Sequence, residues 1–269
     1  MSQERALRAY YSLGKEEGRL GAGLGAVEFE RTQEVVLRHL PSKPAMVADI
    51  GSGPGRYALW LASLGYEVLL RDIVPLHIEQ ALTAARDAGV SIDAQVGDAR
   101  LLDLPDGCAD AVLLLGPMYH LPDAADRERC LREARRVLRP GGIAYVAAIS
   151  RWSPRLHAQL VRRGYRDYPN MADELPGVEQ TGVMPPLVEG GFVGYTHRPG
   201  DLRREVESAG FACLDLVAVE GLAFALPDLD ERLADETDRA VVLEAARVIE
   251  RVPELLGLRP HLLATARRP

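Results

Sequence analysis

Three glycines within five residues follow a short apolar run and precede a helical pattern. The run is Met46–Ile50, the loop is Gly51–Gly55, and the helical pattern begins at Arg56. Glycine in such a turn lets the backbone bend tightly and lets a ligand approach where a Cβ atom would otherwise stand. The order of strand, glycine turn and helix therefore predicts an α/β fold with a ligand near the end of this first strand.

Short apolar runs alternate with helical patterns from residue 45 to residue 150. This alternation is typical of a parallel sheet wrapped by helices. The predicted strands are Met46–Ile50, Glu67–Arg71, Ile92–Val96, Ala109–Leu115 and Ile143–Ile149. The later part of the chain predicts a helix at Pro199–Ala209, strands at Ala212–Val219 and His261–Ala266, and one long helix between those strands at Leu229–Arg251.

The pattern divides the chain into four segments. We expect an N-terminal helical lid at 1–40, a ligand-binding core at 41–150, a cap insertion for the substrate at 151–198, and a C-terminal completion of the sheet with a helical insertion at 199–269. The cap is predicted because a long irregular segment inside a compact domain is usually a functional lid or binding region.

The composition is that of an ordinary globular protein. Of the 269 residues, 47% are hydrophobic and 26% charged, and the formal net charge is −7. The apolar stretches are far shorter than the roughly 20 residues of a membrane helix, and the charged N-terminus lacks the apolar region of a secretory signal. Three scattered cysteines suit a reducing compartment, and the acidic balance disfavours nucleic acid as a partner. We therefore expect a soluble, cytoplasmic protein.

Two acidic residues near the loop indicate a nucleoside cofactor. Asp72 ends the second predicted strand about 20 residues after Gly51, which is the position of an acid that binds ribose. The loop departs from the dinucleotide fingerprint GxGxxG, because Gly55 comes one residue early and Arg56 stands in the expected place. Asp49 would repel a pyrophosphate, whereas a ligand with sulfonium and ammonium groups tolerates a carboxylate there.

The pattern Asp-x-Gly-x-Gly-x-Gly, from Asp49 to Gly55, resembles the first motif of class I S-adenosylmethionine-dependent methyltransferases. Gly97–Ala99, Asp110–Gly116 and Leu138–Gly142 are similar to further motifs of this family, in its order and spacing. The stretch Tyr119–Leu121 resembles the corresponding stretch in a bacterial subgroup of small methyltransferases. The resemblance implies a Rossmann-like fold with a seven-stranded, mostly parallel sheet, an antiparallel last strand, a helical cap, and S-adenosyl-L-methionine as cofactor.

The resemblance also implies a role for individual residues around the cofactor. The methionine part is expected to lie against Gly51, Gly53 and Gly55, with Asp49 beneath it. The adenosine part is expected to lie against Asp72, which accepts from the ribose hydroxyls, and against Ile73, Asp98 and Ala99. Leu115 is expected near the transferred methyl group, and Tyr11 is expected to fold over the cofactor. Each residue also has a purely structural interpretation, as part of a turn, a strand end or the core.

Tyr119 and His120 directly follow the fourth predicted strand and are candidate catalytic residues, because ligands of open α/β sheets bind beyond the carboxyl ends of strands. His120 is a candidate general base, since imidazole titrates near neutral pH, and His197 is a second candidate. Packing is the alternative role for both histidines. Methyl transfer from a sulfonium requires alignment rather than a metal, so no metal site is expected.

The expected acceptor is a hydroxyl, carboxyl or amine of a small organic molecule. The stretch Gly116–Tyr119 lacks the amide found in relatives that methylate base amino groups, and no cysteine follows a proline as in pyrimidine carbon-5 methylation. Two alternatives stay open. One is an NAD(P)-dependent oxidoreductase, which Arg56 and Asp49 disfavour, and the other is a non-catalytic S-adenosylmethionine-binding subunit. The sequence fixes neither the acceptor nor the oligomeric state.

Overall fold

The computed structural model describes residues 3–14, 16–186 and 191–269. Its centre is a sheet formed by β1 Met46–Ile50, β2 Glu67–Asp72, β3 Asp93–Val96, β4 Ala109–Leu114, β5 Leu138–Ser150, β8 Ala212–Ala218 and β9 His261–Arg267. The strands follow the order β3-β2-β1-β4-β5-β9-β8, and only β9 runs antiparallel to its neighbours among these described strands. The predicted Rossmann-like, mostly parallel sheet with an antiparallel last strand is confirmed.

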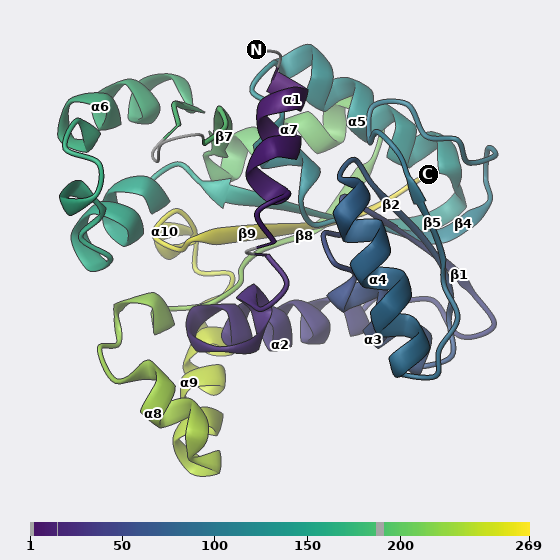
Figure 1. The fold of residues 1–269 in the computed structure, drawn as a ribbon, viewed down its shortest axis with the longest axis horizontal. Coiled ribbons are helices and arrows are strands. Elements are labelled where there is room, and N and C mark those ends of the chain that lie inside the picture. Colours follow the sequence, from purple (N-terminus) through teal and green to yellow (C-terminus); the bar gives the residue numbers. More distant parts are fainter. Residues whose placement is uncertain (1–2, 15, 187–190) are drawn as a thin grey trace.

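Helices cover both faces of this sheet (Figure 1). One face carries α2 Gly23–Leu37, α3 Arg56–Ser63 and α4 Pro75–Asp87, and the other carries α5 Ala124–Val137 and α7 Pro199–Ser208. Along β4, Ala111 and Leu113 pack toward the first group, while Val112 and Leu114 pack toward the second. Because both faces are buried, the strand is a continuous apolar run, as parallel sheets require.

The predicted strands lie within a few residues of those observed, but the single helix predicted at Leu229–Arg251 is wrong. The structure has two helices there, α8 Leu229–Ala234 and α9 Glu236–Ile249. Asp235 separates them with an extended backbone, and its carboxylate accepts hydrogen bonds from the N–H groups of Thr237 and Asp238. This is an N-cap, which an apolar period alone does not reveal inside a long helical pattern.

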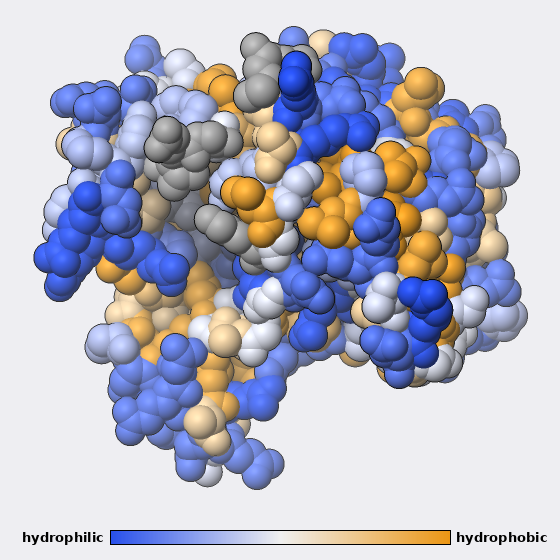
Figure 2. Space-filling model, in the orientation of Figure 1, coloured by the Kyte–Doolittle hydropathy of each residue, from blue (hydrophilic) through white to orange (hydrophobic). Residues whose placement is uncertain are grey.

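The segment 151–198 lies at the carboxyl edge of the sheet, except that residues 187–190 are outside the described part. It contains helical turns at Pro154–Val161 and Gly164–Arg166, α6 Met171–Thr181, and a hairpin of β6 Val183–Met184 and β7 Gly194–His197. The hairpin continues the sheet, because β7 pairs in parallel with the last residues of β5. Figure 2 shows apolar residues gathered between the lobe of α6 and the lobe of α8 and α9.

The N-terminal helix α1 Gln3–Tyr11 crosses in front of the sheet in Figure 1, and the short α10 Pro253–Leu256 precedes β9. Within the described ranges, every helix is too short or too polar to cross a membrane.

The glycine loop is pressed against the segment that follows β4. Gly51 has φ +66°, and a Cβ atom on it would lie 2.7 Å from Cγ of Pro117. A Cβ atom on Gly116 would likewise lie 2.5 Å from the carbonyl oxygen of Gly51. Both contacts require glycine, so the ends of β1 and β4 approach closely only because neither residue carries a side chain.

We expect Gly51→Ala to lower the free energy of unfolding by about 2–4 kcal/mol, because it adds a clash with Pro117 to the strain of a positive φ. Gly53→Ala is the matched control. Gly53 has φ +58°, but a Cβ atom on it would make only an ordinary 3.6 Å contact with Glu16. Gly53→Ala should therefore lower the free energy of unfolding by only about 1–2 kcal/mol. Urea unfolding of both variants measures the difference, and equal losses would contradict the close approach.

Candidate functional site

A cavity at the carboxyl edge of the sheet encloses about 980 Å³, including the open solvent at its mouth. The structure brings ten of the predicted site residues to its wall: Tyr11, Gly51, Gly53, Asp72, Ile73, Asp98, Ala99, Leu115, Tyr119 and His120. Three others lie elsewhere, namely Asp49, Gly55 and His197.

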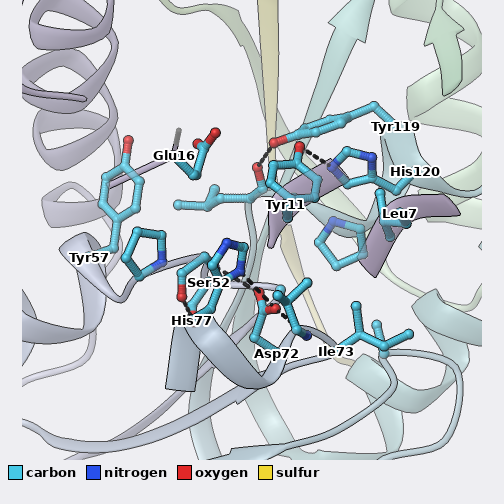
Figure 3. A pocket seen from close by; sticks show the side chains of 18 of the residues that line it. Leu7, Tyr11, Glu16, Ser52, Tyr57, Asp72, Ile73, His77, Tyr119 and His120 are labelled. Atoms are coloured by element: carbon cyan, nitrogen blue, oxygen red, sulfur yellow. Dashed lines mark hydrogen bonds and ion pairs between the residues drawn. The ribbon is translucent and has the colours of Figure 1, made fainter. Parts of the chain in front are cut away.

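Asp72 ends β2, and its carboxylate contacts three different residues of the cavity wall and the loop (Figure 3). Its Oδ2 accepts from the N–H of Gly53 at 2.9 Å, and its Oδ1 accepts from the N–H of Val74 at 2.8 Å. Nδ1 of His77 lies 3.0 Å from the same Oδ1. These contacts fix the carboxylate between the glycine loop and the first turn of α4, where it faces the cavity.

His77 is a residue that the sequence analysis did not identify. It stands in the first turn of α4, and its side chain is buried in the cavity wall. Its position in the sequence could have indicated it. Pro75 begins α4 three residues after the predicted ribose acid Asp72, so the first turn of this helix lies close to the end of β2.

Asp49 lies in β1, two residues before Gly51, and is fully buried. Neither of its carboxylate oxygens has a hydrogen-bond partner of good geometry among the described residues. Burial and the neighbouring charge of Asp72 raise the pKa of Asp49 to about 7, and the backbone N–H of Ala58 opposes this shift only weakly. An orphaned buried acid of this kind suits a cationic ligand above it, because a nearby positive charge stabilises the ionised carboxylate.

Gly55 was expected against the methionine part, but it is not among the residues that line the cavity. Gly55 caps α3 with φ +83°, and a Cβ atom on it would lie 3.0 Å from side chains of Ala81 and Leu70. It therefore serves the packing of α3 against α4 and β2, one position beyond the ligand-facing part of the loop.

Asp98 and Ala99 follow the carboxyl end of β3 and line the cavity. Arg100 holds the Asp98 carboxylate with bonds of 2.6–3.1 Å and also reaches Asp126. Burial opposes ionisation of Asp98, but these hydrogen bonds lower its pKa overall. Asp98 is thus a fixed, ionised acceptor at this end.

Tyr119 and His120 enter the cavity beside Tyr11. The Tyr11 hydroxyl and Nε2 of His120 share a hydrogen bond of 3.1 Å, and the Tyr119 hydroxyl donates to the Leu115 carbonyl at 2.9 Å. Phe192 of the cap packs on both the Tyr11 and His120 rings. Burial, with smaller contributions from Arg19 and His77, lowers the pKa of His120 to about 3. The imidazole is therefore neutral at physiological pH and weakly basic.

His197 was expected as a second general base, and the structure places it outside the cavity. Its side chain is fully buried, and its Nε2 lies 3.2 Å from Oε2 of Glu205 on α7. The same carboxylate binds Arg127, whose guanidinium also donates to the carbonyls of Leu121 and Pro122 at 2.9 Å each. His197 therefore belongs to a group of contacts that fixes the loop after His120.

A group of charged residues lies at the far wall of the cavity and also escaped the sequence analysis. Arg19 lines the cavity and binds Glu28 of α2 at 2.5 Å. Glu28 approaches His261 at the start of β9, and His261 in turn binds Glu220 after β8. These residues are far apart in the sequence, so no local pattern indicates them.

Three of these residues, Glu28, Glu220 and His261, have ligand atoms within 4.8 Å of one another, a spacing that would suit a metal ion. Burial lowers the pKa of His261, but the two carboxylates outweigh it and raise the pKa to about 9. The imidazole is thus protonated in this arrangement, and Arg19 binds the oxygens of Glu28. The group is therefore a charge-balanced salt-bridge network.

A glycine loop beside an acid that ends β2, in a sheet with one antiparallel strand next to β5, defines a nucleoside-binding protein of the Rossmann-like class. Comparison with known proteins narrows this class. Residues 48–146 match the family model described as a methyltransferase domain. Residues 48–146 are thus similar in sequence to methyltransferase domains, and the fold is that of S-adenosylmethionine-dependent methyltransferases.

Two relatives illustrate the similarity in sequence. A ubiquinone/menaquinone biosynthesis C-methyltransferase of Acidiphilium cryptum is 35% identical over 124 residues, which cover 44% of this chain and 48% of the relative. A ubiquinone biosynthesis O-methyltransferase of Methylocella silvestris is 33% identical over 111 residues, 41% of this chain and 42% of the relative. The match thus spans less than half the length of these relatives.

Solved structures share the fold over most of the chain. An S-adenosylmethionine-dependent methyltransferase of Methanosarcina mazei has a TM-score of 0.59 at 22% identity, covering 87% of this chain and 96% of that one. The (4+2) cyclase SpnF has a TM-score of 0.58 at 23% identity, covering 95% and 85%. A methyltransferase and a cyclase are equally similar here, so the fold alone does not decide the reaction.

We expect His261→Gln to destabilise the protein more at pH 6 than at pH 9.5. The folded-state pKa of His261 is raised to about 9, so the stability that its charge contributes is complete below the unfolded value near 6.5 and disappears as pH rises through about 9. The difference in unfolding free energy between wild type and variant should shrink by about 2–3 kcal/mol across this range. Urea unfolding at both pH values measures it, and a pH-independent difference would contradict the ion pair.

Proposed function

We propose that the protein transfers a methyl group from S-adenosyl-L-methionine to a hydroxyl, carboxyl or amine of a small organic molecule. One observation carries this proposal: a single cavity is lined by the glycine loop, Asp72 and Asp98–Ala99. The methyltransferase-domain match over residues 48–146 includes all of these residues and supports the same conclusion.

In this proposal the chain holds the cofactor along the ends of β1 to β4. Asp72 accepts from the ribose, Asp98 and Ala99 border the adenine, and the methionine part lies over Gly51 and Gly53. Arg19, which also lines the cavity, is the candidate partner of the methionine carboxylate. When bound, the cofactor supplies a methyl carbon that is already activated by its sulfonium. The protein then needs only to align donor and acceptor and exclude water.

We further propose that residues 1–40 and 151–198 enclose the acceptor. Tyr11 of the first segment and Phe192 of the second pack against each other at the cavity wall, and both contact His120. Two relatives are named for C- and O-methylation in quinone biosynthesis, which supports a small organic acceptor. The low pKa of His120 favours an acceptor atom that needs little help in losing a proton.

Binding of S-adenosylhomocysteine tests the cofactor assignment. We expect Asp72→Asn to weaken the affinity about 10- to 100-fold, because a hydrogen bond to a charged acceptor is worth about 1.5–3 kcal/mol. Asp87→Asn changes an exposed acid in the same α4 region and should leave the affinity unchanged. Calorimetric titration measures both variants. A wild type that bound NADH instead would establish the oxidoreductase alternative.

The His120 imidazole should be neutral throughout the physiological pH range. Because its pKa is lowered to about 3, its protonation begins only as pH falls far below 5.5. We therefore expect the ratio of methyl-transfer rates of wild type and His120→Ala to be constant between pH 5.5 and 9 and smaller than about tenfold. The acceptor is first found by screening metabolite extracts with methyl-labelled cofactor. An acidic limb near pH 6.5, absent from the variant and with a loss of about 10²–10⁴-fold, would show a general base.

A further inference from the structure

His77 presents a second polar atom beside the proposed ribose acid. Its side chain is 3% exposed, it lines the cavity, and its Nδ1 lies 3.0 Å from Oδ1 of Asp72. Figure 3 shows the two side chains next to each other below Tyr11. The ring is held from the cavity side by Tyr11, whose ring meets it edge to face at 5.4 Å.

The contact with Asp72 fixes which nitrogen of His77 carries the proton. The two carboxylate oxygens already accept from the N–H groups of Gly53 and Val74, so Asp72 acts as an acceptor here. Nδ1 of His77 must then be the donor. The uncharged tautomer that carries its hydrogen on Nδ1 has a lone pair on Nε2.

Nε2 of His77 is buried and has no hydrogen-bond partner among the described residues. A buried acceptor without a partner is unfavourable, and native proteins usually satisfy such atoms with protein, water or ligand. A hydroxyl donor from a ligand in the cavity would satisfy it. The nearest fixed ligand-binding group is the Asp72 carboxylate, which binds ribose under the proposed function.

Resting on that proposed function, we propose that His77 is a further cofactor-binding residue whose Nε2 accepts a hydrogen bond from one hydroxyl of the ribose. Asp72 and His77 then hold the ribose diol together. Asp72 supplies charged acceptors, and it also sets the tautomer in which His77 is an acceptor. The pair recognises a ribonucleoside and discriminates against a cofactor that lacks the hydroxyl bound to His77.

The test is a cycle of protein and ligand changes, read by calorimetry. His77→Asn keeps a donor in the position of Nδ1 but has no counterpart of Nε2, and His77→Gln has the converse arrangement. The ligands are S-adenosylhomocysteine and its 2′-deoxy and 3′-deoxy analogues. We expect His77→Asn to lower the affinity for S-adenosylhomocysteine about three- to tenfold. For one of the two deoxy analogues, the same substitution should lower the affinity by less than about twofold.

Two results would overturn the proposal: His77→Asn lowers the affinity for all three ligands by the same factor, or it changes none of the three affinities. His77 would then be a residue that only positions Asp72. A wild type that does not bind S-adenosylhomocysteine would instead overturn the proposed function, and this inference with it.

A measurement on the wild type covers the case in which the variants do not fold. The ¹⁵N resonance of Nε2 in His77 should shift when S-adenosylhomocysteine binds, and shift clearly less with the deoxy analogue that lacks the partner hydroxyl. Equal shifts with all three ligands would also overturn the proposal.

Discussion

The carboxylate of Asp72 joins three parts of the structure that the site requires together. It binds the glycine loop after β1 through the N–H of Gly53, the first turn of α4 through the N–H of Val74, and the ring of His77. Because β1 and β2 are neighbouring parallel strands, their carboxyl ends meet at this residue. The same acid that is proposed to hold the ribose therefore also shapes the wall around it.

Charge pairs connect this wall to distant parts of the chain. Helix α2 carries Glu28 near its start, at the cavity, and the fully buried Arg31 binds Glu250 after α9 at 2.5 Å. Arg38, at the end of α2, binds the same carboxylate at 2.9 Å. Removing one member of such a buried pair leaves an uncompensated charge, so α2 is held in one position between the cavity and the C-terminal helices.

The features that could be predicted from the sequence are those whose signal is local. The strands, the glycine loop and the acid of Asp72 follow from short runs and fixed spacing. Residue spacing does not tell where a side chain points, which explains why His197 was expected in the cavity although it faces Glu205 in the interior. Nor does it tell which distant residues meet, so His77 and the network around Glu28 could only be found in three dimensions.

The position of β9 has a consequence for the order in which the fold assembles. This last strand lies between β5 and β8, and it is the only partner of β8 among the described strands. It pairs with β5 across more than a hundred intervening residues, as in Tyr145 opposite Thr265. Such non-local pairing is slow to form, and synthesis proceeds from the N-terminus. While the chain emerges from the ribosome, one edge of β5 therefore stays unpaired until β9 has been made, although the glycine loop and Asp72 were completed long before.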